Sequence, residues 1–155
     1  MKYLESIWTK ILESYTGYDW EFSSATDTKV KYNFTDSENN EYLVEFKSLP
    51  GRKNDISTEW ELTYFVHNED HYSVSKLTGV NPFKVCHTVL TDILTDFTKR
   101  YSWVKSIHIH GLSKDRERSS ISQRTKMYVR HLERNPIPGY KLLPNYGNRI
   151  NLVKI

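Results

Sequence analysis

The sequence is poor in several features, and each shortage excludes a class of protein. Cys86 is the single cysteine among 155 residues, so an internal disulfide is impossible and no CxxC motif or Cys/His cluster is available for structural zinc. No run of eighteen apolar residues occurs, and Glu5 and Lys10 interrupt the apolar pattern near the N-terminus. We therefore expect neither a membrane-spanning helix nor a secretory leader, but a soluble, intracellular chain whose fold is held by packing alone.

Carboxylates are scarce in the last third of the chain. Residues 1–98 contain nine Lys and Arg against sixteen Asp and Glu, a net charge of −7, whereas residues 99–155 contain thirteen against three, a net charge of +10. The overall charge of +3 hides this division. Such asymmetry within one chain is an argument about partners, and it points to an anionic one.

A chain of 155 residues and 18.4 kDa is long enough to bury one core, so we predict a single α+β domain over residues 1–155. Apolar residues from Tyr3 to Tyr15 recur at helical spacing and predict an N-terminal amphipathic helix. Three runs then alternate with period two and predict an antiparallel β-meander, with a short fourth strand around Tyr72 and Val74. These runs are Val30–Phe34, Tyr42–Phe46 and Trp60–Val66.

The second half of the chain is predicted to add two helices, a strand and a hairpin. Asn81 is placed to cap a central core helix that begins at Pro82 and ends near Arg100, with Cys86 as an inert thiol in its buried stripe. The remaining elements are a strand over 103–110, a basic helix over 120–134 and a terminal β-hairpin over 140–143 and 149–155. The fold class expected is α+β, with the meander packed against the N-terminal and central helices.

A run of seven cations within 21 residues is the most informative feature. Three of them, Lys126, Arg130 and Arg134, recur every four residues, so a helix would align them in one stripe that can follow a phosphate backbone. Arginine predominates, which favours planar recognition of phosphate and stacking on bases. The alternative interpretation is a solubilising basic face. The other cations of the run are Lys114, Arg116, Arg118 and Arg124.

Aromatic residues make up 14% of the chain, and several lie in the basic half. Tyr101, Trp103 and Tyr140 are candidates for stacking on the bases of a single strand, since such sites combine a basic groove with exposed rings. Tyr101, Tyr140 and Tyr146 come near the ends of predicted elements and are expected to face solvent more freely. Tyr128 falls in the apolar arc of its helix and is expected in the core.

An enzyme is the weaker interpretation. His108 and His110 lie on one face of a predicted strand, a spacing that some metal hydrolases use, but a zinc site needs a third ligand and a base. Glutamates on the polar faces of the neighbouring strands could converge on a metal, although alternating Glu on a solvated strand is the ordinary outcome. These are Glu41, Glu45, Glu59 and Glu61. No Walker A, GxGxxG, GxSxG or HExxH motif occurs, so we predict no cofactor, no metal and no enzymatic activity.

Three segments in order resemble a group of small tailed-bacteriophage proteins of mostly unassigned function. They are a start Thr78-Gly79-Val80-Asn81-Pro82-Phe83-Lys84-Val85, a helix Thr88–Phe97 and a helix start Arg124-Thr125-Lys126-Met127-Tyr128, following a meander that ends in a Trp-containing strand. The resemblance covers about residues 28–143 and implies a phage origin and this α+β order. Pro82 and the Arg-rich insertion 114–120 depart from the group. A looser likeness is to chimallin C, the RNA-binding protein of jumbo phages.

The sequence therefore predicts a phage protein that binds RNA or single-stranded DNA with low sequence specificity, because no base-reading motif is visible. It is expected in the cytoplasm of the infected bacterial host, away from membranes, and a homo-oligomer is compatible with the pattern. The alternative from another class is an accessory protein that binds a host or phage protein, for example to counter a defence system. A metal-dependent phosphodiesterase that uses His108 and His110 is the weaker alternative.

Overall fold

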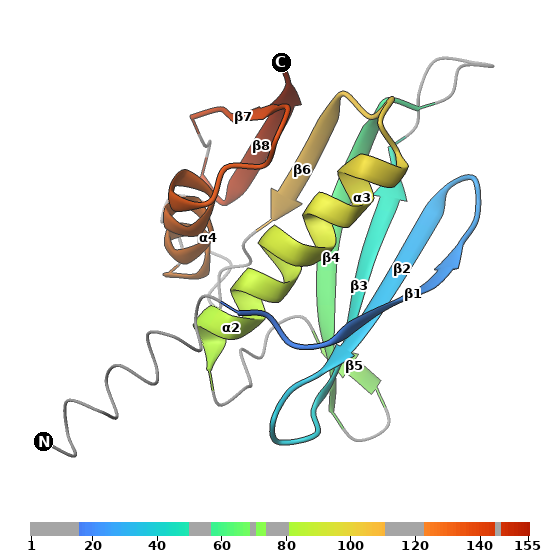
Figure 1. The fold of residues 1–155 in the computed structure, drawn as a ribbon, viewed down its shortest axis with the longest axis vertical. Coiled ribbons are helices and arrows are strands. Elements are labelled where there is room, and N and C mark those ends of the chain that lie inside the picture. Colours follow the sequence, from blue (N-terminus) through green and yellow to red (C-terminus); the bar gives the residue numbers. More distant parts are fainter. Residues whose placement is uncertain (1–15, 50–56, 69–70, 74–80, 111–122, 145–146) are drawn as a thin grey trace, which may run out of the picture.

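The computed structural model describes residues 16–49, 57–68, 71–73, 81–110, 123–144 and 147–155, and these form a mixed β-sheet covered by helices (Figure 1). The predicted helix Tyr3–Tyr15 lies outside the described residues. The sheet has the order β1-β2-β3-β4-β6-β8-β7, and β5 pairs with β4. The strands are β1 (Trp20–Ala25), β2 (Lys29–Thr35), β3 (Glu41–Ser48), β4 (Glu59–Asn68), β5 (His71–Ser73), β6 (Ser106–His110), β7 (Tyr140–Leu142) and β8 (Arg149–Lys154). The α+β prediction is confirmed.

The predicted meander forms from β2, β3 and β4, and strict alternation along each strand explains why. Tyr32, Val44 and Leu62 belong to the inward set, and each is at most 1% exposed, while their sequence neighbours point to the opposite face. The short strand predicted around Tyr72 is β5, and Val74 lies outside the described residues. The additional strand β1 was not predicted, because alternation in Trp-Glu-Phe-Ser-Ser-Ala breaks after Phe22, where the pairing with β2 shifts register.

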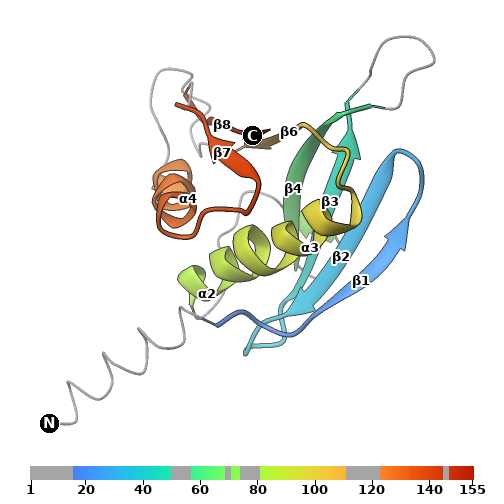
Figure 2. The same cartoon turned by 45° about the horizontal axis from the view of Figure 1, so that its top comes forward.

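One helical segment crosses the inner face of the sheet, as predicted for residues 82–100. It consists of α2 (Pro82–His87), a π-helical turn η1 (Thr88–Ile93) and α3 (Leu94–Arg100). The predicted cap is confirmed, since Asn81 Oδ1 accepts a hydrogen bond from the Lys84 N–H at 3.2 Å and Pro82 occupies the first helical position. Figures 1 and 2 show this segment and α4 (Gln123–Arg134) on the same side of the sheet.

The crossover brings β6 beside β4 in parallel, and their pairing is short. The ladder runs from Glu59–Ser106 to Leu62–Ile109, whereas β4 continues for six residues beyond Leu62. Pairing on this edge of β4 resumes with β5 at Val66. Between the two, no strand among the described residues pairs with Thr63, Tyr64 and Phe65 on this edge. The result is a notch at the carboxyl end of β6, the position where open sheets with parallel strands place ligands.

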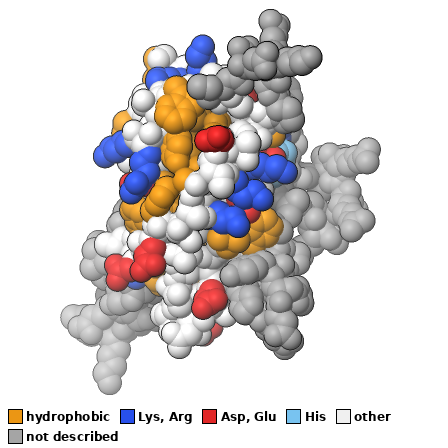
Figure 3. Space-filling view, turned by 90° about the vertical axis from the view of Figure 1, so that its right-hand side faces the viewer, with side chains coloured by type: hydrophobic (Ala, Val, Ile, Leu, Met, Phe, Trp, Pro, Cys, Tyr) orange, Lys and Arg blue, Asp and Glu red, His pale blue; other side chains and the backbone are white. Residues whose placement is uncertain are grey.

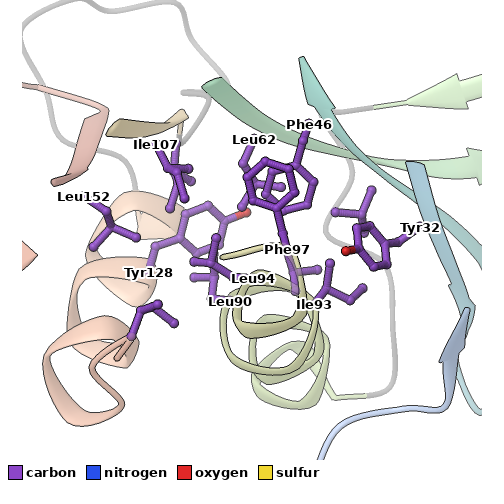
Figure 4. Close-up of a cluster of buried hydrophobic side chains, with 14 of the residues drawn as sticks. Tyr32, Phe46, Leu62, Leu90, Ile93, Leu94, Phe97, Ile107, Tyr128 and Leu152 are labelled. Atoms are coloured by element: carbon purple, nitrogen blue, oxygen red, sulfur yellow. The ribbon is translucent and has the colours of Figure 1, made fainter. Parts of the chain in front are cut away.

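The core is densest where the central helix meets β3 and β4. Phe46 and Phe97 stack with ring centroids 3.8 Å apart and 7° between their planes, and both are fully buried. Figure 4 shows Tyr128 of α4 in the same cluster, which confirms its predicted core position. Cys86 is also buried as predicted, and burial raises the pKa of its thiol to about 12, so it stays protonated and unreactive.

A buried carboxylate holds the turn between β2 and β3. Asp36 is 5% exposed and accepts hydrogen bonds from the main-chain N–H groups of Glu38 and Asn40, from Asn40 Nδ2 and from Tyr42 Oη, at 2.8–3.0 Å. Burial alone raises the pKa of this carboxyl, but the hydrogen bonds from Asn40, Glu38 and Tyr42 together outweigh it, and the pKa is lowered.

Replacing Asp36 with Ala is expected to lower the free energy of unfolding at pH 7 by about 2–3 kcal/mol, because the buried Tyr42 hydroxyl and two turn amides lose a charged acceptor. The lowered pKa adds a pH signature. Stability from ionised Asp36 is present above its unfolded pKa of about 3.9 and is lost as the pH falls toward the lower folded value. Urea titrations of the unmodified protein and of Asp36→Ala at pH 7 and pH 3 check this. The difference between their free energies of unfolding should be smaller at pH 3, and an equal difference at both pH values would contradict the prediction.

Candidate nucleic-acid interface

Helix α4 separates its side chains into a buried face and a cationic face. Thr125, Tyr128 and Leu132 are buried against the sheet and the central helix, and Tyr128 Oη donates a hydrogen bond to Tyr64 Oη at 2.6 Å. On the other side, Lys126, Arg130 and Arg134 are exposed. The predicted stripe is therefore present, because residues four apart share one side of a helix.

The three cations of the stripe have no carboxylate partner among the described residues, unlike Arg100 and Lys29. Arg100 is bound to Asp96 at 2.5 Å, and Lys29 lies 3.5 Å from Glu45. Figure 3 shows Lys/Arg and Asp/Glu side chains mixed on the face that it presents, around a strip of hydrophobic side chains. From Gln123 to the C-terminus, by contrast, the chain has seven Lys and Arg against Glu133 as the single acidic residue. This part of the chain therefore carries a net positive charge, which favours an anionic partner.

Arg124 does not belong to the stripe. It is 7% exposed and lines a pocket of about 270 Å³ at the notch between β4 and β6. The apolar walls of this pocket come from β4, η1 and β6, and the polar groups come from β4, β6 and α4. The lining residues are Glu61, Leu62, Thr63, Tyr64, Val89, Leu90, Ile109, His110, Arg124 and Tyr128.

The two tyrosines of the pocket are hydrogen-bond donors. Burial raises the pKa of Tyr64 and, further, that of Tyr128, so both hydroxyls keep their protons at neutral pH. Their mutual bond uses one of the two hydroxyl hydrogens, whichever residue donates it, and the second hydrogen remains for another acceptor. The pocket therefore offers this hydroxyl hydrogen to a small planar group that carries acceptor oxygens, with Arg124 among the lining residues.

The predicted stacking residues divide into three kinds. Trp103 is 45% exposed and is available to a partner. Tyr101 is half-buried, with its ring 5.0 Å from that of Phe97. The expectation that Tyr140 faces solvent is wrong: it is 7% exposed, and its hydroxyl donates to the Val104 carbonyl at 2.5 Å, which fixes the start of β7 against the turn before β6. Tyr146, Lys114, Arg116 and Arg118 lie outside the described residues.

The two histidines of β6 share the outer face of the sheet, as the alternation predicted. Ile107 and Ile109 fill the core, and His108 and His110 point the other way. His110 Nε2 lies 3.5 Å from Glu61 Oε1, and His108 Nε2 lies 4.0 Å from Glu59 Oε2. Across the described ranges, no three His, Cys, Asp or Glu side chains are grouped so that they could hold a metal ion.

The same face receives two side chains from β8 that the sequence analysis did not single out. His108 Nδ1 lies 2.5 Å from Asn151 Oδ1, and Arg149 Nε donates to that same oxygen at 3.2 Å. A second guanidinium nitrogen, Arg149 Nη2, lies 3.0 Å from His108 Nδ1. His108 and Asn151 are 43 residues apart in the chain, so only the pairing of β6 with β8 reveals this grouping.

Comparisons with known proteins give no relative for this chain: no family model, no curated protein and no solved structure matches it. Among the described residues, no helix has the length and apolar character needed to cross a membrane.

Proposed function

We propose that this protein binds single-stranded nucleic acid, RNA or DNA, through the exposed face of α4. The observation that carries the proposal is the stripe of Lys126, Arg130 and Arg134, which α4 holds in solvent without a described carboxylate partner. Cations that only make a surface soluble need no regular arrangement and can be mixed with acidic residues. Cations at four-residue spacing on one side of a helix form a row that can contact successive phosphates.

Two further features support a single strand over a duplex. Trp103 is exposed and can stack on a base. The pocket beside Arg124 holds about 270 Å³, enough for a small planar group such as one unstacked base. A duplex keeps its bases paired and offers neither group a partner. Base-reading motifs are absent from the sequence, so we expect low sequence specificity.

The proposal includes the setting that the sequence resemblance implies, a phage protein acting in the cytoplasm of an infected bacterium. Binding to a host or phage protein is the alternative. It predicts that α4 does not respond to nucleic acid.

Mapping the surface that responds to ligand tests the proposal. Adding a twelve-nucleotide single strand to ¹⁵N-labelled protein is expected to shift amide resonances of α4 and of residues 147–155. Resonances of β2 and β3 are expected to stay in place, since these strands lie at the other end of the sheet. Shifts confined to the meander, or no shifts at millimolar oligonucleotide, would move the function away from α4.

A further inference from the structure

We propose that the outer face of β4, β6 and β8 is a metal-independent catalytic site that cleaves RNA at the phosphodiester bond, with His108 and His110 as base and acid. The inference rests on the proposed function only in taking a nucleic-acid strand as the substrate. It goes beyond binding, because the groups assembled here are those of proton transfer at phosphorus.

The spacing of the two imidazoles fits the reaction. His108 and His110 are two residues apart on one strand face, so their Cα atoms are roughly 6.6 Å apart. In an in-line displacement the attacking and leaving oxygens lie on opposite sides of phosphorus. Two imidazoles on one strand face can therefore approach one phosphate together, as a base for one oxygen and an acid for the other.

Asn151 sets the tautomer of His108. Its Oδ1 accepts from Arg149 Nε as well as from the imidazole, which identifies this atom as the amide oxygen. An amide oxygen can only accept, so the tautomer that satisfies the 2.5 Å contact with Asn151 carries its hydrogen on His108 Nδ1. In this tautomer the acceptor that the ring offers to Arg149 Nη2 is Nε2, 3.4 Å away, and not Nδ1. The other ring nitrogen, Nε2, is then the lone-pair nitrogen of neutral His108 and can take a proton. Asn151 is a positioning residue in this scheme.

His110 is held for the opposite role. Its side chain is 40% exposed and lies 3.5 Å from a carboxylate oxygen of Glu61, so the protonated form of His110 makes an ion pair there. Glu61 and His110 both line the pocket at the notch. A base of the substrate that enters this pocket would place its sugar and phosphate beside His110.

Arg149 supplies the charge for the phosphate. Its Nη2 lies 3.0 Å and 3.4 Å from the two ring nitrogens of His108, so the guanidinium lies alongside the imidazole. Arg149 pairs in register with His110 across β6 and β8, and the residue is exposed. A phosphate between the histidines would thus meet a guanidinium, the preferred partner of phosphate oxygens.

The reaction needs nothing beyond the strand itself. The ribose 2′-oxygen attacks phosphorus and gives its proton to His108 Nε2. The bond from phosphorus to the 5′-oxygen breaks, and His110 gives that oxygen a proton. The products are a 2′,3′-cyclic phosphate and a 5′-hydroxyl, and the two histidines end with their protonation states exchanged. Because the 2′-hydroxyl is the nucleophile, DNA is not a substrate.

A ribodinucleotide such as UpA, incubated with the full chain in the presence of EDTA, tests the proposal. We expect a cyclic phosphate product, no cleavage of the matching deoxydinucleotide, and a rate at least about 100-fold lower for His110→Ala and for His108→Ala. Lys99→Ala, on exposed α3 surface, is the control and should cleave at the unmodified rate. Absence of cyclic phosphate, or a rate that persists in His110→Ala, would overturn the proposal.

The positioning role of Asn151 has its own readout. Asn151→Asp keeps an oxygen acceptor for His108 Nδ1 and should retain most of the cleavage rate, while Asn151→Leu should lose it without a change in the circular dichroism spectrum. Equal rates for the two variants would contradict the assigned tautomer.

Failure of this proposal can be told apart from failure of the proposed function. Binding is measured with a single-stranded DNA oligonucleotide, which cannot be cleaved. Binding of DNA without cleavage of UpA rejects the catalytic site alone, whereas cleavage of UpA without binding of DNA rejects the role of α4 alone.

Discussion

Replacing Lys126, Arg130 and Arg134 together with Ala is expected to weaken binding of a single-stranded oligonucleotide by about 100-fold at 0.1 M salt. Each cation that contacts a phosphate of a single strand releases roughly 0.7 of a counterion, so three lost contacts correspond to about two powers of ten at this concentration. Fluorescence anisotropy measures the two dissociation constants. The fold is expected to be unchanged, because all three side chains are in solvent.

A matched variant tests whether the loss of binding comes from the α4 stripe or from the lower net charge of the protein. Replacing Lys31, Lys47 and Lys99 with Ala removes the same three charges from β2, β3 and α3. At 0.1 M salt the screening length is about 10 Å, so this variant should bind within about threefold of the unmodified protein. Equal losses for the two triple variants would show that overall charge, rather than α4, governs binding.

Replacing Phe97 with Ala is expected to lower the free energy of unfolding by about 3–5 kcal/mol. Phe97 is fully buried, and its ring contacts those of Phe46, Trp60 and Tyr101 at centroid distances of 3.8–5.5 Å. Removing it leaves a cavity at the junction of sheet and helix. A loss of this size is a large share of the 5–15 kcal/mol that stabilises a typical domain.

The control for this prediction is the same substitution at Phe83, whose side chain is 60% exposed. Phe83→Ala removes the same atoms from α2 but creates no cavity, so its effect on unfolding in urea should be within about 0.5 kcal/mol. A loss below 1 kcal/mol for Phe97→Ala would contradict the core described for this fold.

Much of the fold was predictable because its elements have one buried face. Period-two alternation in β2, β3 and β4 and the capped start at Asn81 are local signals, and both are confirmed. Strand β1 lacks such a signal, since most of its residues are exposed and its pairing contains a bulge. The π-helical turn at Thr88–Ile93 was also beyond the sequence pattern, which cannot separate it from α-helix.

The candidate site was predictable only in part, because only some of its features have a local signal in the sequence. The spacing of Lys126, Arg130 and Arg134 within one helix predicted their common exposure. The burial of Tyr140 depends on a carbonyl 36 residues earlier in the chain, which no local pattern contains. The grouping of His108 with Asn151 depends on the pairing of β6 with β8, and Asn151 and Arg149 carry no motif of their own.

The salt dependence of oligonucleotide binding tests the central claim most directly. Dissociation constants of the unmodified protein for a fluorescent single strand are measured from 50 to 400 mM salt. Three phosphate contacts from α4 predict a log–log slope of magnitude at least about 2, and further cations of the basic run would raise it. Absence of binding at the lowest salt, or binding whose strength does not change with salt, would contradict the account.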